Sequence, residues 1–219
     1  MALSIRPAAS SAPLAAERLR LTANIGIEGD RHADAFSPRQ LLLAGVDAYT
    51  RFDLAPQALR ENLLLDVDVA TLSSGTVLQV GAQALLRVMF VCEACGQLDR
   101  HGARLAARIG VRRGILARVL RGGDVYVGDA LRMIGPALAP WPEDWRQRLV
   151  LVLDAAPEGS VVTYARLAHL AGIQSSYCRA FPAVLKRLGP RYLAKAVSAR
   201  ADPALPRWDG AGLFDPAPA

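Results

Sequence analysis

The chain has 219 residues, of which 52% are hydrophobic and 21% are charged; it is long enough for one or two domains and too apolar for a disordered protein. Its three cysteines, an odd number, exclude a disulfide-stapled scaffold and fit a reducing cytoplasm. The net charge of +6 favours an anionic partner without requiring one.

Neither a membrane span nor a secretory leader is expected. The longest charge-free run, Val69–Leu86, is interrupted by serine, threonine, glutamine and glycine, so it lacks the apolar length of a span. The early stretch Pro7–Ala16 is rich in proline and serine rather than apolar. We therefore expect a cytoplasmic protein with no membrane partner. Its oligomeric state is not indicated.

The first half has the pattern of short strands separated by turns. Arg121–Asp124, with two glycines between apolar runs, predicts a hairpin turn. The expected strands are Leu41–Leu43, Val77–Val80, Ala84–Val91, Ile115–Leu120 and Val125–Val127, and the expected helices are Val46–Phe52, Pro56–Asn62 and Arg100–Ile109. Many short strands with spaced turns favour a mainly-β barrel or sandwich with a few helices.

A domain boundary is indicated at Met133–Pro142, which carries no charge and three prolines. Because proline fixes φ and removes an N–H, this stretch predicts a stiff linker. The predicted division is a domain over 1–134, a linker over 135–142, a second domain over 143–210 and a tail over 211–219. The Pro/Gly-rich stretch Ala201–Ala219 supports the tail.

After the linker the apolar spacing becomes helical. Asp144 lies in the first turn of one expected helix, and Thr163 caps a second helix that ends at Gly172. Ser175 or Ser176 starts a third, which runs toward Leu188. Two helices joined by a short turn predict a small, mainly-α, winged-helix-like domain with a helix-turn-helix.

Two thiols stand just before a basic window in the first domain. Cys92 and Cys95 precede Arg100–Gly123, which holds seven arginines, one histidine and no acid. Nearby positive charge stabilises a thiolate and makes its sulfur nucleophilic, and guanidinium groups also hold phosphate. The alternative interpretation is that the cysteines are small core residues and the arginines a solvated helix face.

Two other roles for the cysteine pair stay open. A zinc site needs four ligands; Cys92 and Cys95 supply two, and His32 and His101 are the remaining candidates. A thioredoxin-type redox pair is the other, although the surrounding pattern is β-rich rather than βαβ.

Taken together, the motifs of the first half resemble the MOSC domain, the family named after the C-terminal part of molybdenum-cofactor sulfurases. The order and spacing hold over about Ile5–Ile134. The matching stretches are Gly26–His32, Pro38–Leu43, Glu61–Leu63, Leu72–Gly75, Cys95–Leu98, Arg112–Ile115 and Gly122–Asp129.

The resemblance implies a β-barrel in which Cys95 carries sulfur as a persulfide, received from a cysteine desulfurase, which is a pyridoxal-phosphate enzyme. Molybdenum cofactor (molybdopterin) is an implied ligand. The implied activity is sulfur transfer or molybdenum-cofactor-dependent reduction, without settling that the chain is an enzyme. The implied pocket and anion-binding residues are Asp30, His32, Arg39, Gln40, Glu61, Asn62, Arg112 and Arg113.

One departure from the family pattern concerns the thiol segment. The family often has proline before its cysteine, and this chain has Ala94. Cys92 is an additional thiol three residues earlier. It is a candidate either for resolving a persulfide or for forming a disulfide, and the sequence does not choose.

The second half resembles the DNA-binding domain of O6-alkylguanine alkyltransferases and alkyltransferase-like proteins. The resemblance rests on Pro157–Ala168 and on Ser176–Ala180, within a window, 159–201, that has seven basic residues and no acid. It implies duplex DNA as a partner, with Tyr164 pressing a flipped nucleotide, Arg179 filling the base stack and Arg166 nearby.

This resemblance is degenerate. The alkyl-accepting Pro-Cys-His-Arg motif is absent and Cys178 lies elsewhere, so alkyl transfer is not expected. Pro182 stands where the family usually has glycine, so the helix either begins near Ala180 or is kinked. Two hypotheses follow: a sulfur-carrying or molybdenum-cofactor-binding protein with an appended DNA-binding module, or a non-enzymatic DNA-lesion binder with the first domain as scaffold.

Overall fold

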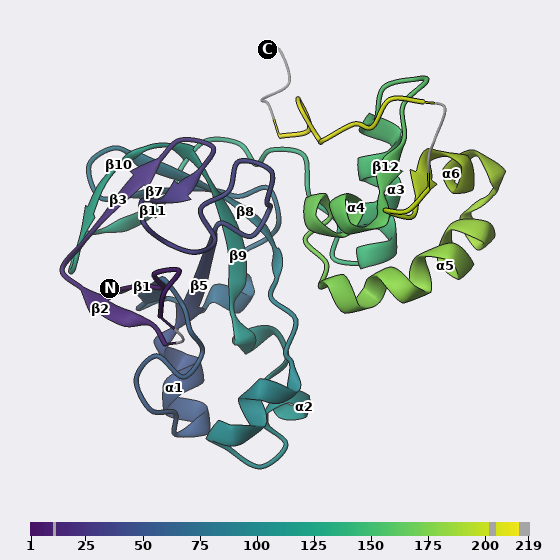
Figure 1. Cartoon of the computed structure of the whole chain (residues 1–219). Helices are drawn as coiled ribbons and strands as arrows, with labels where there is room; N and C mark the ends of the chain where they lie inside the picture. The colour runs from purple at the N-terminus through teal and green to yellow at the C-terminus, as the bar shows by residue number, and fades with distance from the viewer. Residues whose placement is uncertain (11, 202–204, 215–219) are drawn as a thin grey trace. The chain divides into compact units, whose positions relative to one another are not determined.

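The computed structural model describes residues 1–10, 12–201 and 205–214 (Figure 1). Residues 215–219 of the predicted tail lie outside this part of the chain. The chain forms two compact units. Unit 1 comprises residues 1–35 and 39–141, and unit 2 comprises residues 36–38 and 142–219.

Unit 1 contains two sheets. The first has the strand order β11-β7-β8-β9-β5-β6-β1-β2, and the second has the order β10-β3-β4. The strands are β1 (Ala2–Ile5), β2 (Leu14–Ala16), β3 (Arg18–Thr22), β4 (Gly26–Ile27), β5 (Leu41–Gly45), β6 (Leu63–Leu65), β7 (Val77–Val80), β8 (Ala84–Val91), β9 (Ile115–Arg121), β10 (Gly123–Tyr126) and β11 (Leu131–Met133). Expected strands thus recur as β5, β7, β8, β9 and β10.

The predicted barrel is wrong. The large sheet is open among the described residues, because its edge strands β11 and β2 pair only with β7 and β1. The sheet is also mixed, since β5 and β6 run parallel while the other pairs are antiparallel. Hydrophobic alternation identifies strands but carries no information about whether the two edges meet, and a closed barrel requires that pairing.

The predicted hairpin at Arg121–Asp124 is also wrong. β10 pairs with β3 of the second sheet, in the register Gly123 to Leu21, instead of turning back onto β9. The chain passes between sheets at Gly122, where a Cβ atom would lie 2.5 Å from the carbonyl oxygen of Leu21. The two glycines therefore permit a close approach of backbones rather than a tight turn.

The helical segments of unit 1 are short. They are α1 (Val46–Phe52), η1 (Val69–Thr71), η2 (Gly96–His101), α2 (Leu105–Ile109) and η3 (Gly110–Arg113). The prediction of α1 is confirmed, and the expected helix over 100–109 is divided between η2 and α2. The helix expected over 56–62 is wrong, because Gln57 and Arg60 have positive φ angles of 62° and 57° that an α-helix does not accept.

Two apolar clusters hold unit 1 together. The larger one joins both sheets and includes Leu43, Leu63, Leu86 and Val119. The smaller one lies under α1 and α2, which sit together at the end of unit 1 far from β3 and β10 (Figure 1). All five residues of β5 are buried, as expected of a central strand covered on both faces.

The segment predicted as a stiff linker is hydrogen-bonded along unit 1. The backbone N–H of Leu138 donates to the carbonyl of Gly75 over 2.8 Å. The Ser74 hydroxyl donates to the carbonyl of Trp141, whose own N–H donates to Ser74 Oγ over 2.7 Å. Prolines in this stretch thus end a strand pairing while the intervening backbone groups find partners on the sheet.

Unit 2 is mainly helical. It contains α3 (Trp145–Ala155), β12 (Val162–Thr163), α4 (Tyr164–Leu170), η4 (Ser175–Ala180), α5 (Phe181–Leu188), α6 (Pro190–Lys195) and β13 (Ala196–Val197). The predicted Thr163 cap is confirmed, because Thr163 accepts from Arg166 N. Asp144, expected in the first turn of its helix, instead caps α3 by accepting from Arg146 N. Pro182 occupies the first turn of α5, which begins after Ala180, so the proline removes no helical hydrogen bond.

The strand pairing of unit 2 is not a hairpin. In the described part of this unit, β12 pairs with β13 in parallel, beside one parallel bridge between Val161 and Arg207. The winged-helix assignment therefore stays a prediction. None of the helices in the described ranges combines the length and the apolar character that crossing a membrane requires.

Candidate functional site

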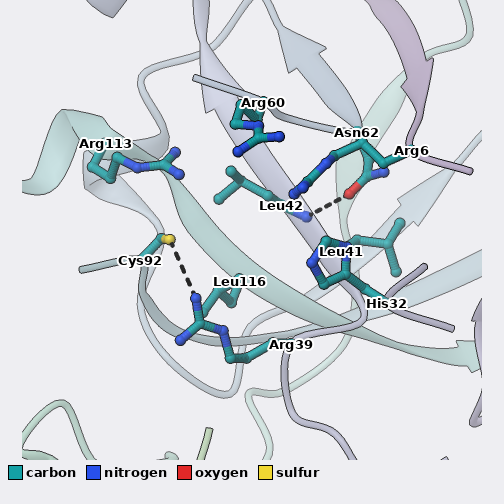
Figure 2. Close-up of a pocket in the computed structure, with 10 residues that line it drawn as sticks. All are labelled: Arg6, His32, Arg39, Leu41, Leu42, Arg60, Asn62, Cys92, Arg113 and Leu116. Carbon is teal, nitrogen blue, oxygen red and sulfur yellow. Dashed lines mark hydrogen bonds between the residues drawn. The ribbon is translucent and has the colours of Figure 1, made fainter. Parts of the chain in front are cut away.

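A small cavity of 60 Å³ opens on the large sheet of unit 1 (Figure 2). Its apolar wall includes Leu42 of β5 and Leu116 of β9, which are partners in the sheet register. Its polar wall comes from loops that leave neighbouring strands. The lining residues are Arg6, His32, Arg39, Leu41, Leu42, Arg60, Asn62, Cys92, Arg113 and Leu116.

Four arginines from different parts of the chain meet at this cavity. Arg6 follows β1, Arg39 precedes β5, Arg60 precedes β6 and Arg113 ends η3. After Arg113 the chain turns into β9 at Gly114, where φ is 110° and a Cβ atom would lie 2.5 Å from the carbonyl oxygen of Leu43. Glycine at that position therefore lets η3 bring a guanidinium up to the sheet.

The positive charges of the cavity are not balanced by acids in its wall. Among the ten described residues that line it, none is aspartate or glutamate. Burial, followed by the charges of Arg60, Arg31 and Arg113, lowers the pKa of Arg6, although Asp30 acts in the opposite direction. An anion inside the cavity would relieve this mutual repulsion.

Burial also lowers the pKa of Arg60, and Arg100, Arg31 and Arg113 lower it further, while Cys95 acts in the opposite direction. The Nε atoms of Arg6 and Arg113 are buried and have no hydrogen-bond partner within the described ranges. Such donors are costly to leave unpaired in a folded protein. The cavity is thus electrostatically prepared for an anion.

Cys92 and Cys95 occupy different environments. Cys92 follows β8, is 4% exposed and lies in the cavity wall, with its Sγ 4.0 Å from Nη2 of Arg39 (Figure 2). Cys95 is half-buried at the start of η2 and is not among the lining residues. The cysteine inside the cavity is therefore not the one that the family resemblance selects.

Cys92 and Cys95 are both free cysteines. Cys95 has extended backbone angles, with φ −120° and ψ 161°, where η2 begins. The two thiols are thus separate groups.

Asp30, His32 and Asn62 form one network behind the cavity. Asp30 is buried; its Oδ1 accepts from the backbone N of His32 over 2.8 Å and lies 3.0 Å from Nδ1 of that ring. Its Oδ2 accepts from Arg6 N and from Nδ2 of Asn62, whose Oδ1 accepts from Leu42 N. Burial alone would raise the pKa of Asp30, but the hydrogen bonds from His32 and Arg6 lower it overall. Asp30 therefore positions cavity residues without lining the cavity.

Three further predicted pocket residues lie elsewhere. Gln40 is a structural crosslink: its Nε2 donates to the carbonyls of Asn24 and Asp34, and its Oε1 accepts from Val119 N. Arg112 forms an ion pair with Asp47 at 3.0 Å, outside the cavity wall. Glu61 lines a second cavity. The adjacent residues Arg112 and Arg113 thus have different roles that their sequence context does not distinguish.

The second cavity is larger and mostly apolar, with a volume of 330 Å³. Glu61, which is 3% exposed, lies in its wall and accepts a hydrogen bond from the Tyr49 hydroxyl over 2.6 Å. Burial raises the pKa of Glu61, and burial beside this carboxyl raises the pKa of Tyr49. Asn62 lines both cavities and forms part of the wall between them.

The residues predicted to touch DNA differ in accessibility. The Tyr164 ring packs edge-on against Phe181, with ring centroids 6.0 Å apart. Arg166 donates through Nε to the carbonyl of Asp209. Arg179, in η4, is exposed. Cys178 donates to the carbonyl of Tyr164, and burial raises the pKa of its thiol.

The zinc interpretation finds no support. Among the described residues, no three side chains of histidine, cysteine, aspartate or glutamate gather in the way that metal ligands do. His32 contacts Asp30, and His101 accepts from Arg100 Nε. The pair Cys92 and Cys95 therefore lacks a third ligand.

Sequence reasoning missed Arg6, Arg60 and Cys92 as cavity residues. Arg6 and Arg60 stand outside the basic window 100–123, and only the sheet order β9-β5-β6-β1 brings them near Arg113. To find these residues from the sequence, one would have to know that β5 pairs with β6 and that β6 pairs with β1. Single-sequence periodicity does not supply such long-range pairings.

Unit 1 is a sheet-rich domain that has two thiols and a cavity lined by four arginines. Residues 39–132 of the chain match the family model of the MOSC domain. MOSC domains are associated with sulfur chemistry related to the molybdenum cofactor. No curated protein matches the chain.

Solved structures agree with this fold. The YUAD protein from Bacillus subtilis has a TM-score of 0.52 and 21% identity, covering 59% of this chain and 91% of its own. A structure described as a hypothetical protein has a TM-score of 0.54 and 22% identity, covering 85% of this chain and 88% of its own. YiiM from Escherichia coli has a TM-score of 0.49 and 20% identity, covering 85% and 92%. The likeness of the first two structures, at 21% and 22% identity, concerns the fold alone.

Proposed function

We propose that unit 1 is a sulfur carrier in which the Cys95 thiolate receives sulfur as a persulfide from a protein donor. The observation that supports this most is the position of a two-thiol segment against a cavity with four arginines and no acid in its wall. Cys95 is half-buried, so a donor protein can reach it, and Arg60 lies close enough to interact with its negative charge.

The transfer needs no outside oxidant or reductant. The Cys95 sulfur forms a bond to the terminal sulfur of a donor persulfide, the donor's S–S bond breaks, and its electron pair leaves on the donor cysteine. A cysteine desulfurase, which forms such a persulfide, is the proposed donor. His32 and Arg39 would orient an anionic acceptor in the cavity, and Asn62 holds the wall in place.

The cavity fits only part of a molybdenum cofactor. Its 60 Å³ is far below the roughly 300–1,000 Å³ of pockets that enclose whole small molecules. Arg6, Arg60 and Arg113, with buried unpaired Nε donors on two of them, fit a single phosphate group. When bound, the cofactor would supply redox chemistry at its metal. In this chain those arginines would hold its phosphate, and Cys95 would offer a thiolate ligand.

Intact-mass spectrometry tests the carrier. Anaerobically purified protein treated with a cysteine desulfurase and cysteine should gain the mass of one sulfur atom, released again by a reducing thiol. Cys95→Ser should gain none, whereas Cys92→Ser should gain as much as the wild type. A gain in Cys95→Ser equal to that of the wild type would reject Cys95 as the carrier.

DNA binding by unit 2 is a second candidate, because the window 159–201 has no acid and Arg179, Lys186 and Arg187 are exposed within it. Gel shifts on duplexes with and without an alkylated guanine would test it. Arg179→Ala should weaken binding and reduce the salt dependence by about one phosphate contact. Binding that is unchanged in Arg179→Ala and Tyr164→Ala would remove these residues from the interface. Absence of binding to both duplexes at low salt would reject the candidate.

A further inference from the structure

Cys92 is nearly buried and lines the arginine-lined cavity. Its side chain lies in the cavity wall with 4% of the residue exposed, whereas Cys95 lies outside that wall. A cysteine of another protein cannot approach a thiol with so little accessible surface. Any sulfur donor for Cys92 must therefore be a small molecule that enters the cavity.

The charges of the cavity specify the chemistry of such a molecule. Arg39 lies beside Cys92, which leaves Arg6, Arg60 and Arg113 facing the remaining space (Figure 2). Arg113 is 8% exposed; it donates through Nη1 to the carbonyl of Leu59, while its Nε has no partner among the described residues. A nearly buried guanidinium in the cavity wall, beside two further arginines, points to a bound oxyanion independently of the cysteine.

The volume limits the size of that oxyanion. One water-sized group needs about 10–15 Å³ on this measure, so 60 Å³ accommodates about four to six such groups. Sulfate, phosphate and thiosulfate have five non-hydrogen atoms each and match this size. A sugar phosphate or a pterin would extend out of the cavity.

We propose that the cavity binds the sulfonate end of thiosulfate and that Cys92 is a second catalytic thiol, which takes the outer sulfur of this donor. This goes beyond the proposed function, in which Cys95 is loaded by a protein. The Cys92 thiolate forms a bond to the outer sulfur, the S–S bond of thiosulfate breaks, and its electron pair leaves with sulfite. A persulfide anion remains on Cys92, with no oxidant, reductant or proton consumed.

The charge balance agrees with this step. Thiosulfate carries two negative charges and the thiolate one, against four guanidinium groups in the wall. The negative charge on the sulfonate end increases as sulfite departs. Arg6, Arg60 and Arg113 are the groups positioned to stabilise that change.

The test is an anaerobic incubation of the full chain with thiosulfate, followed by intact mass, peptide mapping and sulfite measurement. Wild type and Cys95→Ser should each gain one sulfur and release one sulfite per chain, with the added sulfur mapped to Cys92. Cys92→Ser and Cys92→Ala should do neither. At subsaturating thiosulfate, Arg60→Gln should lower the rate at least about tenfold because a charge-assisted contact is lost, and Arg112→Gln should leave the rate unchanged.

The outcomes separate this inference from the proposed function. Mapping in the wild type requires no variant to fold. Sulfur that maps to Cys95, or sulfite release unchanged in both Cys92 variants, would overturn the inference. No reaction with thiosulfate alongside loading of Cys95 by the desulfurase would overturn the inference and leave the proposed function standing. Loading of Cys92 by thiosulfate, without loading of Cys95 by the desulfurase, would overturn the proposed function and leave the inference standing.

Discussion

Among the described residues three arginines are more than nine-tenths buried, Arg113 and Arg118 of unit 1 and Arg148 of unit 2, and Arg113 is used differently from Arg148. Arg148 of unit 2 is 1% exposed and donates to three carbonyls, those of Pro142, Glu143 and Ala171. Arg113 of unit 1 lines a cavity and donates to one carbonyl, and its buried Nε has no partner among the described residues. A buried arginine whose donors are satisfied by backbone holds a fold together, whereas one with a spare donor beside a cavity is available to a ligand.

The surrounding basic residues follow the same division. In unit 2, Lys195 donates to the carbonyls of Leu153 and Ala156, and Arg191 pairs with Asp154 at 2.7 Å. In unit 1, burial and the charges of neighbouring arginines, Arg113 among them, lower the pKa values of Arg6 and Arg60. A count of basic residues therefore says little about anion binding, and the partners of each guanidinium decide it.

The largest effect is expected from removing the structural arginine of unit 2. Arg148→Leu should destabilise unit 2 by about 3–5 kcal/mol, because three buried carbonyls lose their donor. Arg146→Leu, at a side chain that is 55% exposed, should change stability by less than about 1 kcal/mol. Chemical denaturation followed by tryptophan fluorescence measures both. Equal stability of the two variants would contradict the assigned role of Arg148.

The next effect concerns the Asp30 network of unit 1. Asp30→Asn should cost about 1–3 kcal/mol at pH 7, because an amide cannot accept all four hydrogen bonds. The pKa of Asp30 is lowered in the fold, so its stabilisation is present above about pH 3.9 and is lost as the pH falls through the folded value. The difference between wild type and variant should shrink below pH 4 in denaturation curves. A constant difference from pH 7 to pH 3 would contradict this.

Glu61 should show the opposite pH dependence, with a smaller effect. Burial raises its folded pKa, so its contribution is fully favourable below about pH 4.3 and is lost as the pH rises through the folded value. Glu61→Gln should therefore become more stable relative to wild type as the pH rises from 4 to 7, by on the order of 1 kcal/mol. If the free energies of unfolding of wild type and variant changed equally with pH, ionisation of the Glu61 carboxyl would not destabilise the fold, which would contradict this prediction.

The smallest effect is expected at Arg112, next to the cavity arginine. Arg112→Gln removes a partly exposed ion pair with Asp47 and should cost less than about 1 kcal/mol. It should leave oxyanion binding unchanged, as measured by calorimetry with sulfate. Loss of sulfate binding in this variant would place the anion site away from the cavity. It would also contradict the separate roles assigned to Arg112 and Arg113.

Local signals in the sequence predicted much of the fold. The sequence predicted the apolar runs of β5, β7, β8 and β9, the helix α1 and the Thr163 cap, because each depends on neighbouring residues. Short strands such as β1, β2 and β11 were missed, since three or four residues carry little periodicity. Sheet closure, and the passage of the chain from β9 to β10, depend on pairing partners far along the chain.

The candidate site divides in the same way. His32, Arg39, Asn62 and Arg113 were predicted from motifs and line the cavity. Gln40 and Arg112 belong to the same motifs but satisfy backbone carbonyls or an aspartate instead. Only the three-dimensional pairing of strands distinguishes these two groups.

The most direct measurement of the central claim is the stabilisation of unit 1 by a simple oxyanion. Sulfate, compared with chloride at equal ionic strength, should raise the free energy of unfolding of the wild type by about 2.7 kcal/mol at a hundred times its dissociation constant. Arg60→Gln should lose most of this gain at the same sulfate concentration, and Arg112→Gln should keep it. An equal response of all three proteins to sulfate would mean that the four arginines do not form an anion site.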